Sequence, residues 1–269
     1  MRADQLLLER GLATSRSQAV RLIASGVRWR QPVPGAGWQR IAKNGQELPE
    51  AAELLLDDDA EARYVSRGGL KLEGALRVSG VAAEGRACLD VGQSTGGFTD
   101  CLLRHGAARV VGVDVGQGQV HAAVRADARV LCLEQVNARE LSPERLAAAL
   151  DTLDRSERHG WREADLAEPF ALVVGDLSFI SLTLVLPALA PLLAAGGDLL
   201  VLVKPQFELQ PGDIGKGGIV RDPALFERVE RRLRDACADA GLAVRGWFDS
   251  PIAGGDGNRE FFIHAGRAP

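Results

Sequence analysis

The sequence predicts an α/β fold: a Rossmann-like, doubly wound sheet of about seven strands, with a small α+β domain at its amino terminus. Three observations predict this fold. After about Leu72, apolar runs typical of buried strands alternate with segments typical of helices. Before that point, two short helical patterns precede strand-like segments, and the charge changes from basic to acidic at about Asp57. Hydrophobic residues make up 46% of the chain, enough to bury the cores of one large and one small domain.

The amino-terminal domain is expected to begin with two helices. The first is expected from Ala3 to Arg10, where Gly11 ends it. The second is expected to begin at Ser15, which forms an S-x-x-Q capping box with Gln18. Gly26 can supply the left-handed residue that ends this helix. Strand-like segments follow, which gives the α+β character of this part of the chain.

Positive charge is concentrated in the same segment. From Arg2 to Lys43 the chain has eight lysines and arginines but only two acidic residues, although the net charge of the whole chain is -4. An acidic total argues against nucleic-acid binding, whereas a local basic surface permits it. The other interpretation is a helical hairpin whose arginines serve only solubility. An acidic run then separates this domain, residues 1–60, from an expected linker at residues 61–71.

The larger domain is expected to span residues 72–269 with alternating strands and helices. Its helices include Phe98–His105 and Pro223–Ala240, the second with Asp222 as its cap and Gly241 as its stop. Because helical crossovers separate the strands, the sheet should be open and mostly parallel. Seven segments are expected to be its strands: Ala87–Asp90, Arg109–Val113, Val130–Leu133, Ala171–Gly175, Asp198–Val203, Ala243–Phe248 and Glu260–His264.

Four polar residues, far apart in the sequence, are the candidates for chemistry: Lys71, Asp176, Lys204 and Glu260. Asp176 ends one apolar run and Lys204 ends the next, so in a parallel sheet both would emerge at the carboxyl edge, where ligands bind. Glu260 stands at the beginning of the last expected strand. A lysine next to an aspartate at this edge suggests proton chemistry. The structural alternative is a pair of strand-end salt bridges.

A glycine-rich turn follows the first strand of the larger domain, with the pattern Asp90-x-Gly92-x-x-x-Gly96-Gly97. Dinucleotide enzymes instead have Gly-x-Gly-x-x-Gly, which places a pyrophosphate at a helix amino terminus. S-adenosylmethionine has no phosphate and needs glycines mainly so that the backbone can approach it. Asp114 ends the second strand, where an acidic residue usually meets an adenosine ribose, and Asn137 follows the third, placed to bond the adenine. A phosphate-free turn with a capping aspartate is the alternative.

Cysteine, histidine and hydropathy patterns exclude several other classes. The four cysteines have no Cys-x-x-Cys spacing and the four histidines are not spaced as metal ligands, so we expect reduced thiols and no metal site. No signal-peptide pattern begins the chain, and no apolar segment is long enough to span a bilayer. We therefore expect a cytoplasmic protein that does not bind membranes.

The amino-terminal domain resembles the alpha-L RNA-binding motif, found in a primary small-subunit ribosomal protein and in pseudouridine synthases. The resemblance rests on Arg2-Ala3-Asp4-Gln5-Leu6-Leu7, the stretch from Arg10 to Ala19, Leu22-Ile23 and Gly26-Val27. After Val27 the motif usually has a strand with an Asn-Gly turn, and this chain has Arg28-Trp29-Arg30-Gln31-Pro32-Val33-Pro34 instead. We expect RNA contacts from four arginines, of which the last lies in the expected linker: Arg2, Arg16, Arg21 and Arg67.

Across nearly the whole chain, the order of motifs resembles the TlyA, or hemolysin A, family of S-adenosylmethionine-dependent ribosomal RNA 2′-O-methyltransferases related to FtsJ. The motifs are Ser66-Arg67-Gly68-Gly69-Leu70-Lys71, Leu89-Asp90-Val91-Gly92, Ser94-Thr95-Gly96-Gly97-Phe98, Val113-Asp114-Val115-Gly116, Asp176-Leu177-Ser178-Phe179-Ile180-Ser181, Lys204-Pro205-Gln206-Phe207-Glu208 and Gly257-Asn258-Arg259-Glu260-Phe261. The family implies a cytidine ribose in ribosomal RNA or ribosomal subunits as the substrate. One departure is Gln93, where the family usually has alanine.

The resemblance also implies a role for each candidate residue. Lys204 would be the base or activator of the ribose hydroxyl, with Asp176 orienting it, while Lys71 and Glu260 would position the ribose and balance charge. The positive sulfur of the cofactor makes a metal unnecessary. The cofactor contacts that it implies are Asp90, Gly92, Ser94, Gly96, Asp114, Asn137 and Phe179.

Four other functions fit the sequence less well. An amine-directed methyltransferase would carry Asn or Asp-Pro-Pro-Tyr after the fourth strand, where this chain has Asp176-Leu177-Ser178-Phe179. A cytosine carbon-5 enzyme would need a nucleophilic cysteine, often as Pro-Cys, which the sequence lacks. A pore-forming hemolysin finds no membrane segment to support it. A ribosome-assembly factor with a vestigial pocket remains as the non-enzymatic alternative, and the intact tetrad disfavours it.

Overall fold

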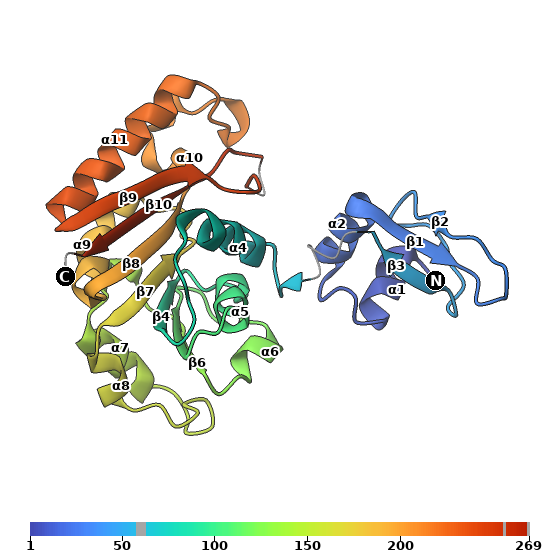
Figure 1. Cartoon of the computed structure of the whole chain (residues 1–269), viewed down its shortest axis with the longest axis horizontal. Coiled ribbons are helices and arrows are strands. Elements are labelled where there is room, and N and C mark those ends of the chain that lie inside the picture. Colours follow the sequence, from blue (N-terminus) through green and yellow to red (C-terminus); the bar gives the residue numbers. More distant parts are fainter. Residues whose placement is uncertain (58–62, 255–256, 268–269) are drawn as a thin grey trace. The chain divides into compact units, whose positions relative to one another are not determined.

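The computed structural model of the chain describes residues 1–57, 63–254 and 257–267. The chain divides into two compact units, Met1–Leu70 and Lys71–Pro269 (Figure 1). Most of the acidic run expected before the linker lies outside the described residues. Helix α4 (Gly68–Ser79) begins within the expected linker, so the last residues of that segment are helical.

In its described residues, the smaller unit is built mainly of two helices and a three-stranded antiparallel sheet in the order β2-β1-β3. Leu6 and Leu7 of the first helix pack with Leu22 and Ile23 of the second in one apolar core, which explains why this short segment folds as a body. The elements are α1 (Ala3–Glu9), α2 (Arg16–Gly26), β1 (Val27–Arg30), β2 (Gln39–Arg40) and β3 (Glu53–Leu56).

The start of α2 confirms one half of the predicted capping box and corrects the other. The Ser15 side chain accepts a hydrogen bond from the Gln18 amide, as expected of a helix cap. The Gln18 carbonyl oxygen, however, accepts from the amide of Thr14 at 2.6 Å and from its hydroxyl at 2.9 Å. The side chain of Gln18 therefore stabilises the turn that leads into the helix.

The larger unit contains the predicted seven-stranded, mostly parallel sheet. Its strand order is β6-β5-β4-β7-β8-β10-β9, which starts in the middle and runs outward in both directions, as in doubly wound folds. Only β10 is antiparallel to its neighbours β8 and β9. The strands are β4 (Ala87–Val91), β5 (Arg109–Val113), β6 (Val130–Leu133), β7 (Phe170–Gly175), β8 (Leu193–Val203), β9 (Leu242–Asp249) and β10 (Phe261–Arg267).

Helices cover both faces of this sheet (Figure 1). Helix α4 lies on one face with α5 (Gly97–Arg104) and α6 (Ala122–Arg125). The other face is covered by α7 (Pro143–Asp151), α8 (Glu163–Ala167), α9 (Leu186–Leu189) and α11 (Pro223–Asp239). Short helical turns complete the unit: α10 (Pro205–Glu208), η1 (Ala138–Glu140), η2 (Leu182–Leu184), η3 (Ala190–Leu192), η4 (Pro211–Asp213) and η5 (Lys216–Gly218).

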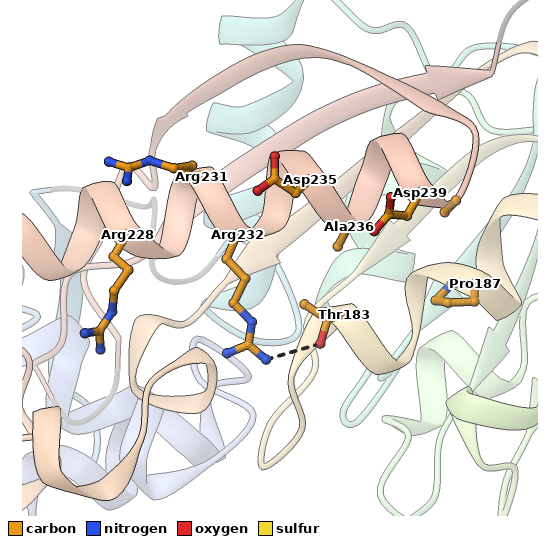
Figure 2. Close-up of a pocket in the computed structure, with 9 residues that line it drawn as sticks. Thr183, Pro187, Arg228, Arg231, Arg232, Asp235, Ala236 and Asp239 are labelled. Carbon is orange, nitrogen blue, oxygen red and sulfur yellow. Dashed lines mark hydrogen bonds between the residues drawn. The ribbon is translucent and has the colours of Figure 1, made fainter.

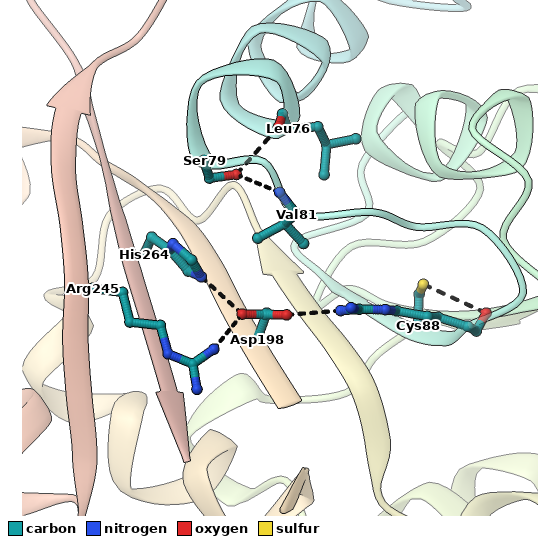
Figure 3. A network of polar contacts seen from close by, with 8 residues as sticks. Leu76, Ser79, Val81, Cys88, Asp198, Arg245 and His264 are labelled. Carbon is teal, nitrogen blue, oxygen red and sulfur yellow. Dashed lines mark hydrogen bonds and ion pairs between the residues drawn. The ribbon is translucent and has the colours of Figure 1, made fainter. Parts of the chain in front are cut away.

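A buried ionic network holds β10 between its neighbours near the amino ends of the parallel strands (Figure 3). Asp198 of β8 accepts from His264 of β10 at 2.8 Å, from Arg245 of β9 at 2.5 Å and from Arg86, just before β4, at 2.8 Å. Burial opposes ionisation of Asp198, but these donors outweigh it and lower the pKa of the carboxyl group. The network therefore links three adjacent strands of the sheet with one carboxylate.

Candidate active site

Asp176 and Lys204 meet at the carboxyl edge of the sheet. Strands β7 and β8 are parallel neighbours, with Gly175 paired to Val201, so the residues that follow both strands emerge side by side. The Lys204 Nζ lies 2.6 Å from Asp176 Oδ1. Both side chains remain partly accessible, with 12% and 22% of their surfaces exposed. A solute that reaches this edge can therefore touch the lysine.

Glu260 reaches the same edge because β10 runs in the opposite direction. Phe261 pairs with Val203, so the amino end of β10 lies beside the carboxyl end of β8, which leads directly to Lys204. The carboxylate of Glu260 is 3% exposed and lies 2.6 Å from the Nζ of Lys71, which α4 supplies. The structure thus brings all four predicted catalytic residues together as two ion pairs.

The electrostatics of the cluster are those of close opposite charges in a partly buried site. The closest carboxylate oxygens of both pairs, Asp176 Oδ1 and Glu260 Oε2, approach the lysines without the angles of a hydrogen bond. Burial raises the pKa of Glu260, and the neighbouring Lys71 ammonium opposes that shift. The charges of Asp176 and Lys204 also act on Glu260, so the two pairs form one electrostatic unit.

Ser178 is a member of this site that sequence reasoning did not assign. Its hydroxyl accepts a hydrogen bond from Lys204 Nζ at 2.8 Å. The lysine therefore has two neighbours on the segment that follows β7, the Asp176 carboxylate and the Ser178 hydroxyl. The only sequence signal was its place two residues after Asp176, in a motif that matched as a whole.

A cavity of about 510 Å³ opens beside Asp176. Five of the seven predicted cofactor residues line it, namely Gly92, Ser94, Asp114, Asn137 and Phe179. The Asp114 carboxylate accepts the amides of Ser94 and Gly116, each at 2.7 Å, which fixes its orientation at the end of β5. The other residues that line the cavity are Val113, Val115, Gln119, Val136, Ala138, Asp176, Leu177, Ser178 and Ile180.

Glycine is required at position 92 for two reasons. Its φ of +83° lies in the left-handed region, which disfavours a side chain. A Cβ there would lie 2.6 Å from the main-chain oxygen of Asp176. The glycine turn therefore lets β4 approach the segment that carries Asp176.

Asp90 and Gly96 do not line this cavity, unlike the other predicted cofactor residues. Asp90 is fully buried and accepts a hydrogen bond from the Thr99 hydroxyl at 2.7 Å, and burial raises its pKa to about 7. Gly96 caps the amino end of α5 with a φ of +91°, and a Cβ there would meet Val124 at 3.0 Å. Both residues therefore support the glycine-rich turn on the side that faces away from the cavity.

The departure at Gln93 has a local explanation. Its side chain is buried and lies over Gly112 of β5, where a Cβ would approach the Gln93 Nε2 to 2.0 Å. The Nε2 donates to the Thr99 hydroxyl at 3.0 Å, which in turn donates to Asp90. The larger side chain is therefore accommodated by a glycine on the neighbouring strand and does not enter the cavity.

Phe179 stands out at the mouth of the cavity. It is 90% exposed and has a φ of +62°, an uncommon conformation for an aromatic residue. Its ring packs on Phe207 with a centroid separation of 5.0 Å. An exposed aromatic face beside the predicted catalytic residues provides a surface on which a planar ligand could stack.

The predicted RNA-binding arginines belong to the smaller unit, and two of them have a structural role there. Arg2 and Arg16 both contact the fully buried carboxylate of Asp4, at 2.9 and 3.0 Å. The hydrogen bond from Arg2, with help from Arg16, outweighs burial and lowers the pKa of Asp4 to about 2. The Arg16 side chain is nevertheless 68% exposed, while Arg21 and Arg67 are half-buried.

Three other features of the described residues bear on function: membrane spans, metal ligands and cysteines. In the parts of the chain that the structure describes, no helix has the length and apolar character needed to cross a membrane. Within the same residues, no three His, Cys, Asp or Glu side chains gather as metal ligands would. The four cysteines are free and buried.

The chain is similar to known proteins over nearly its whole length. The family model of FtsJ-like methyltransferases matches residues 64–267. The 16S/23S rRNA (cytidine-2′-O)-methyltransferase TlyA of Mycobacterium tuberculosis is 41% identical over 97% of this chain and 88% of its own length. Hemolysin A of Brachyspira hyodysenteriae is 34% identical over 98% of this chain and 99% of its own.

A solved structure from Streptococcus thermophilus, of a protein that bears the name hemolysin, covers 100% of this chain and 88% of its own. It has a TM-score of 0.71 and 39% sequence identity. The resemblance seen in the motifs therefore extends over both units of the chain. The chain belongs to the TlyA, or hemolysin A, family of FtsJ-like methyltransferases.

Proposed function

We propose that this protein transfers a methyl group from S-adenosylmethionine to the ribose 2′-hydroxyl of a cytidine in ribosomal RNA. The observation that carries the proposal is the Lys204–Asp176 pair, 2.6 Å apart at the rim of the cavity. A lysine amine at this edge is the group that an unreactive ribose hydroxyl needs. The relative from Mycobacterium tuberculosis, which is named for this reaction, supports the choice of substrate.

The cavity fits S-adenosylmethionine better than it fits a phosphate-bearing cofactor. Among the described residues that line it there are two carboxylates, Asp114 and Asp176, and no lysine or arginine. A phosphate would lack a counter-charge there, whereas a cation would be attracted. Asp114 directly follows β5, where its carboxylate can accept hydrogen bonds from ribose hydroxyls, and Asn137 offers an amide to a base. When bound, the cofactor supplies an electrophilic methyl group on a positively charged sulfur.

The residues of the chain would prepare the hydroxyl for attack. Lys204 would accept its proton in the uncharged form, while the Ser178 hydroxyl accepts a hydrogen bond from the amine and the Asp176 carboxylate lies 2.6 Å from its nitrogen. The third tetrahedral direction of the nitrogen is then left for the substrate. The Lys71–Glu260 pair would position the ribose without adding net charge. Phe179 offers its exposed face to the base of the target nucleotide.

The smaller unit would anchor the RNA. Its basic surplus between Arg2 and Lys43 supports this role, with Arg2, Arg16, Arg21 and Arg67 as the proposed contacts. Both arginines contact Asp4, but the Arg16 side chain is 68% exposed and that of Arg2 only 37%, so we expect Arg16 to contribute more to phosphate binding. The other interpretation, arginines that serve only solubility, predicts no loss of RNA affinity when this unit is removed.

The test is to identify the methylated atom. Ribosomal RNA or subunits are incubated with the protein and methyl-labelled cofactor, then digested to nucleosides. The proposal expects label in 2′-O-methylcytidine, and none with Lys204→Ala. Label on a base would refute the assignment of the tetrad. An inactive protein that still binds RNA would favour the non-catalytic assembly factor.

A further inference from the structure

Glu208 is a buried acid next to the active site to which the proposed reaction gives no role. It is 3% exposed and does not line the cofactor cavity. Both of its carboxylate oxygens accept hydrogen bonds, Oε2 from the Ser181 hydroxyl at 2.5 Å and Oε1 from the Leu182 amide at 2.7 Å. Burial raises the pKa of Glu208, and these two donors oppose the shift. Burying a carboxylate costs free energy, and the hydrogen bonds to Ser181 and Leu182 offset this cost, which indicates a specific role for Glu208.

These hydrogen bonds join the two segments that carry the catalytic pair. Glu208 ends the helical turn that begins right after Lys204, whereas Ser181 and Leu182 belong to the segment that follows Asp176. Two further contacts join the same segments, the hydrogen bond from Lys204 to Ser178 and the ring contact between Phe179 and Phe207. We use the term clasp for these contacts between residues 177–182 and 204–208.

The clasp is reinforced from outside by α11. Arg232 donates to the main-chain oxygen of Glu208 at 2.5 Å and to the Thr183 hydroxyl at 3.5 Å, and Figure 2 shows the second contact. The Thr183 amide donates to the Ser181 hydroxyl oxygen at 3.2 Å, so Ser181 is held from both sides. The contacts around Glu208 therefore come from three parts of the chain: the turn α10, residues 181–183 and helix α11.

The clasp also accounts for a strained residue. Phe179 has a left-handed φ of +62°, which a non-glycine residue keeps only when the surrounding contacts determine it. It lies between Ser178, which contacts Lys204, and Ser181, which Glu208 holds. Releasing Ser181 would let the segment relax, which would move both the Ser178 hydroxyl and the Phe179 ring.

We propose that Glu208 is a positioning residue of the active site, which holds residues 177–182 so that Ser178 stays on Lys204 and Phe179 stays at the mouth of the cavity. The inference rests on the proposed methyl transfer. Glu208 touches neither cavity nor reacting groups, and it acts through Ser178 and Phe179.

The test combines a double-mutant cycle with hydrogen exchange. Glu208→Gln keeps the shape of the side chain, and we expect single-turnover methyl transfer at saturating cofactor and RNA to slow about 10- to 100-fold. Ser178→Ala should slow it as well. If Glu208 acts through Ser178, the double variant should be much less impaired than the product of the two single effects. Glu230→Gln, which removes a surface ion pair on α11, is the control and should keep the wild-type rate.

Ser181→Ala tests the clasp from the other side, and protects the test if Glu208→Gln does not fold. Hydrogen exchange should speed up in residues 177–184 in either variant, with β7 and β8 unchanged. A wild-type rate for both variants, or single effects that simply multiply in the cycle, would overturn the inference. If the wild-type protein itself shows no ribose methylation, the proposed function is refuted. The clasp is then tested by hydrogen exchange alone, and unchanged exchange in residues 177–184 of both variants would overturn it.

Discussion

Gly92 and Asp176 approach each other so closely that a Cβ on Gly92 would lie 2.6 Å from the main-chain oxygen of Asp176. Gly92→Ala should therefore push the glycine turn away from the segment that carries Asp176. An alanine in the left-handed conformation costs roughly 1 to 2 kcal/mol by itself. Because of the added collision, we expect Gly92→Ala to lower the free energy of unfolding by more than this. We also expect a clear loss of cofactor affinity, measured by titration calorimetry alongside denaturant unfolding.

The matched control is Gly241→Ala. Gly241 has a φ of +73° but nothing within 4 Å of a Cβ, so it carries the same backbone strain without the collision. This variant should lose stability and keep its cofactor affinity. Equal effects of the two substitutions on cofactor binding would mean that the close approach at Gly92 does not shape the site.

Lys204→Arg separates two roles of the lysine. A lysine can release a proton, whereas arginine stays protonated in essentially all proteins. If Lys204 is the base, the arginine variant should bind the cofactor normally yet lose at least about 100-fold in single-turnover rate, much like Lys204→Ala. An active arginine variant would show that only a fixed positive charge is needed, and would leave the methyltransferase assignment intact.

Asp90 should make the stability of the protein depend on pH. Burial raises its pKa from 3.8 to about 7, so its contribution to folding is fully present below 3.8 and is lost as the pH rises through about 7. Asp90→Asn keeps an acceptor for Thr99 and cannot ionise. Between pH 4 and pH 8, we expect the variant to gain on the order of a few kcal/mol relative to the wild type. Parallel denaturation curves that differ by a constant amount at all pH values would contradict this.

Removing residues 1–60 should weaken RNA binding and reduce its dependence on salt, because the basic surplus lies in that segment. Cofactor affinity should be largely kept, since the cavity is lined entirely by the larger unit. Asp114→Ala should do the reverse. The measurement is the slope of the logarithm of RNA affinity against that of salt concentration. An unchanged slope in the truncated protein would exclude this unit as the RNA anchor.

The strands were predictable from sequence because buried parallel strands are short apolar runs, which the chain places between helices. The direction of β10 was not, because an apolar run looks the same in either orientation. The start of β8 was also missed. It begins at Leu193, before the glycine pair Gly196-Gly197, because its first residue pairs with Phe170 before the register shifts.

The candidate site was predicted where a residue follows a strand, and missed where its role depends on contacts between segments. Asp176 and Lys204 follow apolar runs, so their position was visible in the sequence. Glu208 and Ser178 become significant only when the segments that follow β7 and β8 are seen together. Asp90 ends its run in the expected place, but its side chain accepts a hydrogen bond from Thr99 and does not line the cavity, so its contact with the cofactor stays a prediction.

The insertion of β10 between β8 and β9 has a consequence for how the protein is made. Glu260 reaches Lys71 only through this strand, which the ribosome delivers after every other strand of the sheet. A nascent chain can therefore form the glycine turn and the Lys204–Asp176 pair while its sheet still lacks β10 beside β8. Methyl transfer should begin only with this closing step, so the onset of activity during synthesis would report the completion of folding.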